Sequence, residues 1–253
     1  MEFEEYRIMH EAEDVHWWYR GLRGVMFTLL RLDKGKGREK TILDAGCGTG
    51  GNMYALERAG FSHVLGFDYS PDGLYFCRKR GLDNLCQGSL MAIPFPDNSL
   101  EVAISCDVIN DEGLPDETQA LRELFRVLAP GGRLFLNLPA YSFLRGEHDK
   151  ATSVARRYTT TGISKKLRSV GFRIERATYW NMFLFPVVLA VRLLSRARKR
   201  DEREQARSDI KVPAAPVNAL LVGLLGVEQR LLRRVSLPFG SSVAVVAMKP
   251  RRA

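Results

Sequence analysis

The residues best suited to bind a ligand lie in a glycine-rich segment, TILDAGCGTGGN, at positions 41–52. A short apolar run precedes the glycines, and the helical-looking run NMYALERAG follows them. This order is typical of a strand-to-helix turn in an α/β unit, where free backbone N–H groups and missing side chains let a ligand approach. Gly46, Gly48 and Gly51 also fit the Gly-x-Gly-x-x-Gly spacing of dinucleotide-binding proteins, so the turn alone does not exclude NAD.

Two acidic residues flank this turn at the ends of predicted strands. Asp44 directly precedes the glycines, and Asp68 ends the next predicted strand. A carboxylate at the second position could accept two hydrogen bonds from a ribose diol. Asp44 could bind a ligand or only cap the glycine turn.

A charged connector, SFLRGEHDKATSVARRYT, supplies candidates for acceptor chemistry. His148 could remove a proton from a hydroxyl or an amine, with Asp149 beside it, or it could be an ordinary surface histidine. Arg156, Arg157 and Tyr158 follow closely, and the two guanidinium groups would suit an anionic acceptor. The alternative for the arginine pair is a solvated charge run.

The aromatic cluster His16-Trp17-Trp18-Tyr19 has two interpretations. It could form a lid over a cationic cofactor, because aromatic faces attract a sulfonium as they attract an ammonium group. It could equally be a helix that packs its rings on the edge of a sheet.

Alternating strand and helix patterns must position these residues. The predicted strands are TILDAG, HVLGFD, a weak LCQGS, EVAISCD, RLFLNLP, FRIERATYW and SSVAVVAMK. Helices are expected at residues 15–32, 52–59 and 161–170. Two more helices are expected, one that begins at the Ser70-Pro71 cap and ends at residue 80, and one that begins at residue 115 and ends before Pro130-Gly131-Gly132. This alternation predicts an α/β fold with a doubly wound, largely parallel sheet whose ligands bind at the carboxyl ends of the strands.

The chain divides into three predicted parts. Residues 1–39 form an N-terminal helical lid, 40–180 together with 239–250 form the cofactor-binding core, and 181–238 form a helical insert with two amphipathic helices that caps the acceptor pocket.

Composition narrows the class of protein. The net charge of +9 is concentrated in the C-terminal third, where residues 192–207 carry seven basic and three acidic side chains. Cys47, Cys77, Cys86 and Cys106 show neither a CxxC motif nor accompanying histidines, so we expect no metal and a reducing, cytoplasmic compartment. The acidic N-terminus lacks a signal-peptide pattern, and the longest apolar stretch, 182–191, is about half of a membrane span.

The motifs LDAGCGTG, GFDYS, GSLMAIPFPDNSLEVAISCDVI and LRELFRVLAPGGRLFL together resemble the class I S-adenosylmethionine-dependent methyltransferases over residues 41–138. The resemblance implies a Rossmann-like sheet of seven strands with an antiparallel last strand. It also implies that the backbone at 46–50 lies beside the methionine part of the cofactor, Asp68 beside the ribose, and Cys106 beside the transferred methyl group. The cofactor-binding set would be Asp44, Gly46, Cys47, Gly48, Gly50, Asp68, Tyr69, Ser89, Leu90, Cys106 and Asp107.

HWWYRGLR, RGEHDKATSVARRYT, NMFLFPVVLAVRLL and LPFGSSVAVVAMK resemble a bacterial subfamily often found beside glycosyltransferase or secondary-metabolite genes. By this resemblance Trp17, Tyr19 and Asn110 would bind the substrate together with Arg156 and Arg157. The chain departs from the family at Ser89, where an acid is usual, and from the subfamily at Asn110, Asp111 and Val154, where an acid and two histidines are usual. A neutral hydroxyl binds an adenine amine more weakly than a carboxylate does.

The sequence thus predicts methyl transfer by in-line displacement to a small or lipid-like acceptor, such as a secondary metabolite, an isoprenoid or a glycolipid precursor. His148 is the first candidate base, and Asp149 and Tyr158 complete the catalytic set. Two alternatives are a nucleic-acid methyltransferase, although the chain reads CDVIN where a base-flipping motif would stand, and a non-catalytic or NAD-binding module. The apolar segment 182–194 would ordinarily belong to the core or to a dimer surface, and the arginine-ended helices of the insert also allow peripheral contact with an anionic membrane. The oligomeric state stays open.

Overall fold

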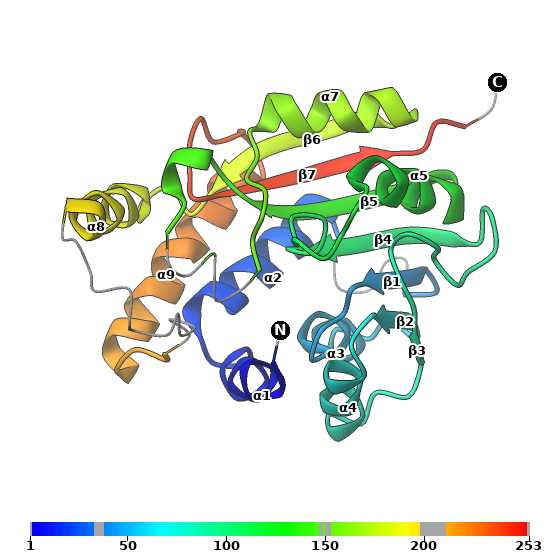
Figure 1. Cartoon of the computed structure of the whole chain (residues 1–253), viewed down its shortest axis with the longest axis horizontal. Helices are drawn as coiled ribbons and strands as arrows, with labels where there is room; N and C mark the ends of the chain where they lie inside the picture. Colours follow the sequence, from blue (N-terminus) through cyan, green and yellow to red (C-terminus); the bar gives the residue numbers. More distant parts are fainter. Residues whose placement is uncertain (1, 33–37, 147–148, 150–152, 198–210, 252–253) are drawn as a thin grey trace.

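A seven-stranded sheet forms the centre of the molecule (Figure 1). The computed structural model describes residues 2–32, 38–146, 149, 153–197 and 211–251. The strand order is β3-β2-β1-β4-β5-β7-β6, and β7 is antiparallel to both of its neighbours while β1 to β5 pair in parallel. The predicted Rossmann-like sheet with an antiparallel last strand is therefore confirmed. The strands are β1 (Thr41–Ala45), β2 (His63–Asp68), β3 (Leu85–Gln87), β4 (Leu100–Cys106), β5 (Leu128–Pro139), β6 (Arg173–Trp180) and β7 (Ser242–Met248).

Helices cover both faces of this sheet (Figure 1). One face packs against α5 and α7, and the other packs against α2, α3, α4 and α9. Successive residues of a strand point alternately into the hydrophobic cores on the two faces of the sheet. On β5, Leu134 and Leu136 belong to the core beneath α5 and α7, and Phe135 belongs to the core beneath α2, α3, α4 and α9. The helices are α1 (Phe3–Ala12), α2 (Trp17–Leu30), α3 (Gly51–Arg58), α4 (Pro71–Lys79), α5 (Glu117–Val127), α7 (Thr160–Val170), α8 (Phe185–Ala197) and α9 (Ala215–Leu232), with a 3-10 turn η1 (Ser142–Leu144).

The structure departs from the sequence predictions in three places. The segment before residue 15 forms a helix of its own, α1, which the sequence analysis did not predict. Ser70 occupies the N-cap of α4, but its side chain makes no capping bond. Strand β5 begins at Leu128, ahead of the Pro-Gly-Gly segment, because Leu128 pairs with Leu100 before the register shifts and Arg133 pairs with Val102.

The insert is tied to the rest of the chain by buried polar contacts of α9. The fully buried Glu228 carboxylate accepts backbone hydrogen bonds from Asn181, at 2.7 Å, and from Phe183, at 2.8 Å. Near the other end of the helix, Asn218 accepts from the N–H of Trp17 at 2.9 Å and donates to the carbonyl of Val15 at 2.8 Å. These bonds attach α9 to α2 and to the link between β6 and α8.

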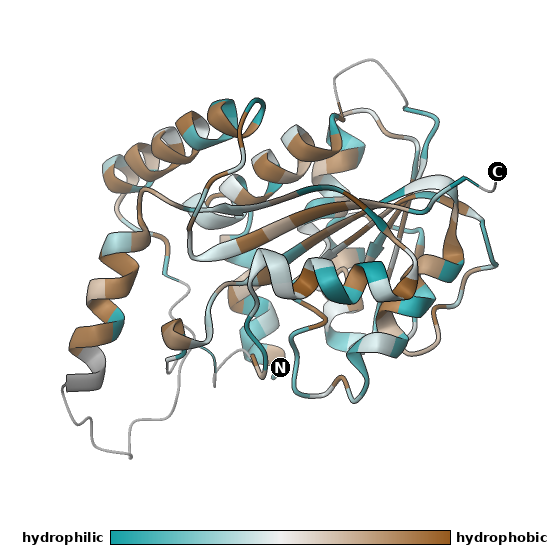
Figure 2. Ribbon diagram, turned by 90° about the horizontal axis from the view of Figure 1, so that it is seen from above, coloured by the Kyte–Doolittle hydropathy of each residue, from teal (hydrophilic) through white to brown (hydrophobic). Residues whose placement is uncertain are grey.

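Hydrophobic residues dominate α8 and α9, the two helices at the left of Figure 2. Among the helices that the structure describes, α9 alone is long and apolar enough to span a membrane by length and composition. This helix packs against α2, where Leu225 and Gln229 face Gly21 and Gly24. Its buried residues are Leu225, Glu228 and Leu232.

Removing the Glu228 carboxylate should loosen the insert. We expect Glu228→Ala to lower the free energy of unfolding by about 1–3 kcal/mol, because two N–H groups at the start of the insert lose their acceptor. Glu228→Gln should cost less, since its amide oxygen can still accept one of the bonds. Urea unfolding followed by circular dichroism measures both, and equal losses in the two variants would contradict this role.

Candidate active site

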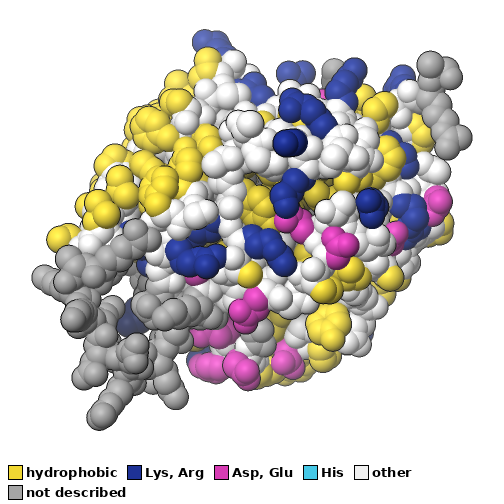
Figure 3. All heavy atoms as spheres, turned by 45° about the horizontal axis from the view of Figure 1, so that its top comes forward, with side chains coloured by type: hydrophobic (Ala, Val, Ile, Leu, Met, Phe, Trp, Pro, Cys, Tyr) yellow, Lys and Arg dark blue, Asp and Glu magenta, His cyan; other side chains and the backbone are white. Residues whose placement is uncertain are grey.

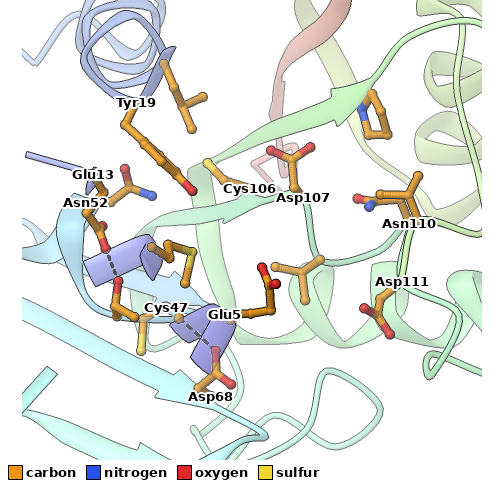
Figure 4. A pocket seen from close by; sticks show the side chains of 18 of the residues that line it. Glu5, Glu13, Tyr19, Cys47, Asn52, Asp68, Cys106, Asp107, Asn110 and Asp111 are labelled. Carbon is orange, nitrogen blue, oxygen red and sulfur yellow. Dashed lines mark hydrogen bonds between the residues drawn. The ribbon is translucent and has the colours of Figure 1, made fainter. Parts of the chain in front are cut away.

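A large cavity of about 1220 Å³ lies at the carboxyl ends of the parallel strands, where the sequence predicted ligand binding (Figure 4). The glycine turn and the residues that end β2 and β4 form its floor. Helices α1 and α2 close one side, and α8 contributes Val188 and Arg192 to the wall.

The glycine turn is shaped by left-handed backbone conformations. Gly46 and Gly50 have φ values of 80° and 84°, which a residue with a side chain adopts only at a cost. The N–H groups of Gly46 and Cys47 both donate to the carbonyl of Phe67 at 2.9 Å, and this fixes the turn against the end of β2. Gly46, Cys47 and Gly48 line the cavity, whereas Gly50 caps the start of α3.

Asp68 joins the turn to the second strand. Its carboxylate accepts from the N–H of Gly48 at 2.7 Å and from the N–H of Ser70 at 2.9 Å. Burial raises the pKa of Asp68, while these two N–H groups act in the opposite direction. A carboxylate has about four lone-pair sites, so two remain for a ligand in the cavity.

Three carboxylates gather around the glycine turn. Asp44 lies just behind it and is fully buried. Burial raises the pKa of Asp44 well above its ordinary value, and the nearby charges of Glu13 and Asp68 add to this effect. The side chain of Asn52 is close enough to act on the Asp44 carboxylate and opposes the rise in its pKa. This part of the site therefore favours a cation.

Glu13, which follows α1, reaches into the same region and was missed by the sequence analysis. It accepts from the hydroxyl of Thr49 and lies 3.3 Å from the guanidinium of Arg80. Burial raises the pKa of Glu13 to about 7. The apolar spacing of Phe3, Tyr6 and Met9 was the sequence signal that could have revealed this helix.

The residues present fit S-adenosylmethionine. The carboxylates of Glu13 and Asp68 line the cavity and suit its positive charges and hydroxyls, and the glycine turn leaves its backbone open, whereas Asp44 lies behind the turn and does not line the cavity. Ser89 and Leu90 line the cavity beyond Asp68, and so does Tyr69, whose side chain is largely exposed. The hydroxyl of Ser89 accepts from the N–H of Met91 at 3.1 Å and can still donate.

A hydrogen-bonded chain holds Asp107 at the end of β4. The indole N–H of Trp180 donates to the oxygen of Asn137, and the amide nitrogen of Asn137 donates to Asp107, both at 2.7 Å. Burial raises the pKa of Asp107 to about 7, although the bond from Asn137 opposes the shift. Asp107 and its neighbour Cys106 both line the cavity, and burial also raises the pKa of the Cys106 thiol.

Asn110 points into the cavity toward Asp107 (Figure 4). Its side chain is buried, and its amide oxygen has no partner among the described residues. A hydroxyl or amine of a bound molecule could donate to this oxygen. Asp107 and Asn110 therefore offer a carboxylate and a free amide oxygen to the same cavity.

The aromatic residues of α2 contribute both to the cavity wall and to the packing on the sheet, the two arrangements considered from the sequence. Trp17, Trp18 and Tyr19 all line the cavity. Trp18 also packs on Trp180 with ring centroids 5.7 Å apart, so one ring serves the core as well as the wall.

The connector after β5 is held together by its own charges. Asp149 lines the cavity, and its carboxylate accepts from Arg157 at 2.6 Å and from the N–H of Gly146 at 2.9 Å. Arg157 also lines the cavity and donates to the carbonyl of Ala140.

Two other predicted residues serve the scaffold. Arg156 donates to the carbonyls of Asp111 and Leu114 and is not among the residues that line the cavity. Tyr158 is buried in the core, donates to the carbonyl of Ile109 and does not line the cavity either, which argues against direct roles for both. His148 lies outside the residues that the structure describes.

Comparisons with known proteins find a methyltransferase domain in the central part of the chain. Residues 43–136 match the methyltransferase domain family. A demethylmenaquinone methyltransferase of Listeria monocytogenes is 38% identical over 115 residues, which cover 42% of this chain and 46% of that protein. The chain thus spans about half the length of the curated relatives it matches.

Solved structures show the same fold. An S-adenosylmethionine-dependent methyltransferase from Thermotoga maritima covers 97% of this chain and 95% of its own, with a TM-score of 0.59 and 17% identity. The geranyl diphosphate C-methyltransferase of Streptomyces coelicolor, solved with S-adenosyl-L-homocysteine, covers 89% and 74%, with a TM-score of 0.57 and 14% identity. At such identities the likeness shows the fold alone. The family match thus covers residues 43–136, and the fold of the whole chain is that of the S-adenosylmethionine-dependent methyltransferases.

Proposed function

We propose that this protein transfers a methyl group from S-adenosylmethionine to a small or lipid-like acceptor with an apolar body. The observation that carries the proposal is the cavity in which the glycine turn, Asp68 and the unpartnered Asn110 oxygen meet. When bound, the cofactor supplies an electrophilic methyl group on a sulfonium. Glu13 and Asp68 would hold its charged and polar groups, and Ser89 and Leu90 would flank its adenine.

The size and lining of the cavity support a lipid-like acceptor. Tryptophan and tyrosine rings from α2 and Val188 from α8 offer apolar walls large enough for a prenyl or aromatic group. The relatives named above include a demethylmenaquinone methyltransferase, and the structural neighbours include a geranyl diphosphate C-methyltransferase. Both names point to acceptors of this chemical class.

Asp107 is the proton acceptor that the geometry favours. It lies beside Asn110, whose oxygen would orient the acceptor, and Asn137 holds its carboxylate toward the cavity. Since the pKa of Asp107 is raised to about 7, its carboxylate can take a proton near neutral pH. His148 remains a second proposal. We place the reaction in the cytoplasm, with Trp17 and Tyr19 helping to exclude water.

Calorimetric titration tests the choice of cofactor. We expect S-adenosylmethionine and its demethylated product to bind and NADH not to bind, because three carboxylates near the glycine turn disfavour a diphosphate. Binding of NADH alone would overturn the proposal and revive the dinucleotide alternative.

The Asp68 carboxylate should matter for the affinity of the cofactor. We expect Asp68→Ala to weaken S-adenosylmethionine binding by about tenfold to a hundredfold, because charge-assisted hydrogen bonds are lost and the glycine turn loses its anchor. Calorimetry measures the change. The matched control is Asp83→Ala, which removes an exposed aspartate before β3. Equal cofactor affinities in the two variants would contradict the role of Asp68.

The Asp107 carboxylate should set the pH dependence of turnover. The base form predominates above its pKa, so we expect turnover to rise as the pH rises through about 7 and then to level off. Asp107→Asn should lower turnover by about a hundredfold or more and abolish this rise, while cofactor affinity is retained. Asp83→Asn serves as the control, and an unchanged pH profile in Asp107→Asn would rule out Asp107 as the base.

A further inference from the structure

Helix α8 presents an outward face that is entirely apolar. Val187, Val191 and Leu194 follow one another at helical spacing and are 60%, 54% and 62% exposed. Phe183 just before the helix and Leu193 beside this row are also exposed. None of the described side chains of α8 is fully buried. Figure 3 shows hydrophobic side chains gathered at the end of the molecule where Figure 1 places α8.

The apolar face continues from α8 toward the end of α9. The rings of Phe185 and Phe239 lie 5.5 Å apart, and Phe239 and Val235 are both exposed. We call the set Phe183, Val187, Val191, Leu194, Val235 and Phe239 the α8 surface. A second exposed row, Val217, Leu220, Val227 and Leu231, runs along α9. Monomeric proteins rarely leave so many large apolar side chains together in water.

The exposed charges of the described part of the insert have one sign. Between residues 182 and 240, the described part of the chain contains one acidic residue, Glu228, and it is fully buried. Lys211, Arg230, Arg233 and Arg234 are exposed in the same span. An insert that carries an apolar face and exposed cations, with no exposed acid among its described residues, complements an anionic lipid bilayer.

The same helix borders the cavity. Val188 and Arg192 of α8 line it, one residue along from the exposed Val187 and Val191. We propose that the α8 surface docks on an anionic bilayer, so that a lipid-like acceptor passes from the membrane into the cavity beside α8. This inference rests on the proposed function for the identity of the acceptor, but the docking itself does not require methyl transfer.

Flotation of the full chain with vesicles tests the docking directly. We expect the protein to float at low salt with vesicles of phosphatidylcholine and phosphatidylglycerol, and much less with phosphatidylcholine alone or at high salt. The double variant Val191→Glu, Leu194→Glu should bind the anionic vesicles at least about tenfold more weakly, because two apolar contacts become charged. The control variant Lys165→Glu, at an exposed position of α7 outside the α8 surface, lowers the net charge equally and should leave binding nearly unchanged.

Circular dichroism and calorimetry with S-adenosylmethionine show whether each variant is folded. Should the double variant not fold, the single variant Val187→Glu, at a position of the α8 surface that is 60% exposed, is a milder change that should also weaken vesicle binding. Wild type that stays out of the anionic vesicle fraction overturns the docking. The docking is also overturned if the wild type does not float and light scattering shows that it is a dimer which the double variant abolishes. In that case the α8 surface would cover a second copy of the chain. If the wild type floats with the anionic vesicles but does not bind S-adenosylmethionine, the proposed function is overturned and the docking still stands.

Discussion

The bond between the Asp68 carboxylate and the N–H of Gly48 is the contact on which the site depends. It joins the ends of two adjacent parallel strands and holds the glycine turn in a conformation that leaves its backbone open to the cavity. The cost of burying this carboxylate is offset by backbone donors on two sides, one from the turn and one from Ser70. The sheet thus supplies a rigid frame, and a short irregular segment supplies the binding surface.

The sequence predicted the parts of the molecule whose pattern is local. The parallel pairing of β1 to β5 follows from alternating strands and helices, and the positions of Asp44, Asp68 and the glycines follow from their places at strand ends. The family resemblance added the antiparallel last strand. These features depend on short runs of sequence, and the structure places them where the runs indicated.

Contacts between distant segments could not be predicted in the same way. The approach of Glu13 to Thr49 joins the N-terminal helix to the turn, and nothing in either segment alone indicates the partner of the other. Arg156 and Arg157 looked like a site for an anionic acceptor, yet backbone carbonyls and Asp149 occupy their donors. A pair of arginines in sequence does not reveal whether its charges face a ligand or the protein itself.

Asn137 shows how a side chain that lies behind the cavity can be restricted as tightly as one within it. The indole of Trp180 can only donate, so the amide must turn its oxygen that way and its nitrogen toward Asp107. An aspartate there could accept but not donate and would set two negative charges together, and a leucine would leave both neighbours unsatisfied. The interior thus constrains the residue at position 137 through the directions of two hydrogen bonds rather than through its volume.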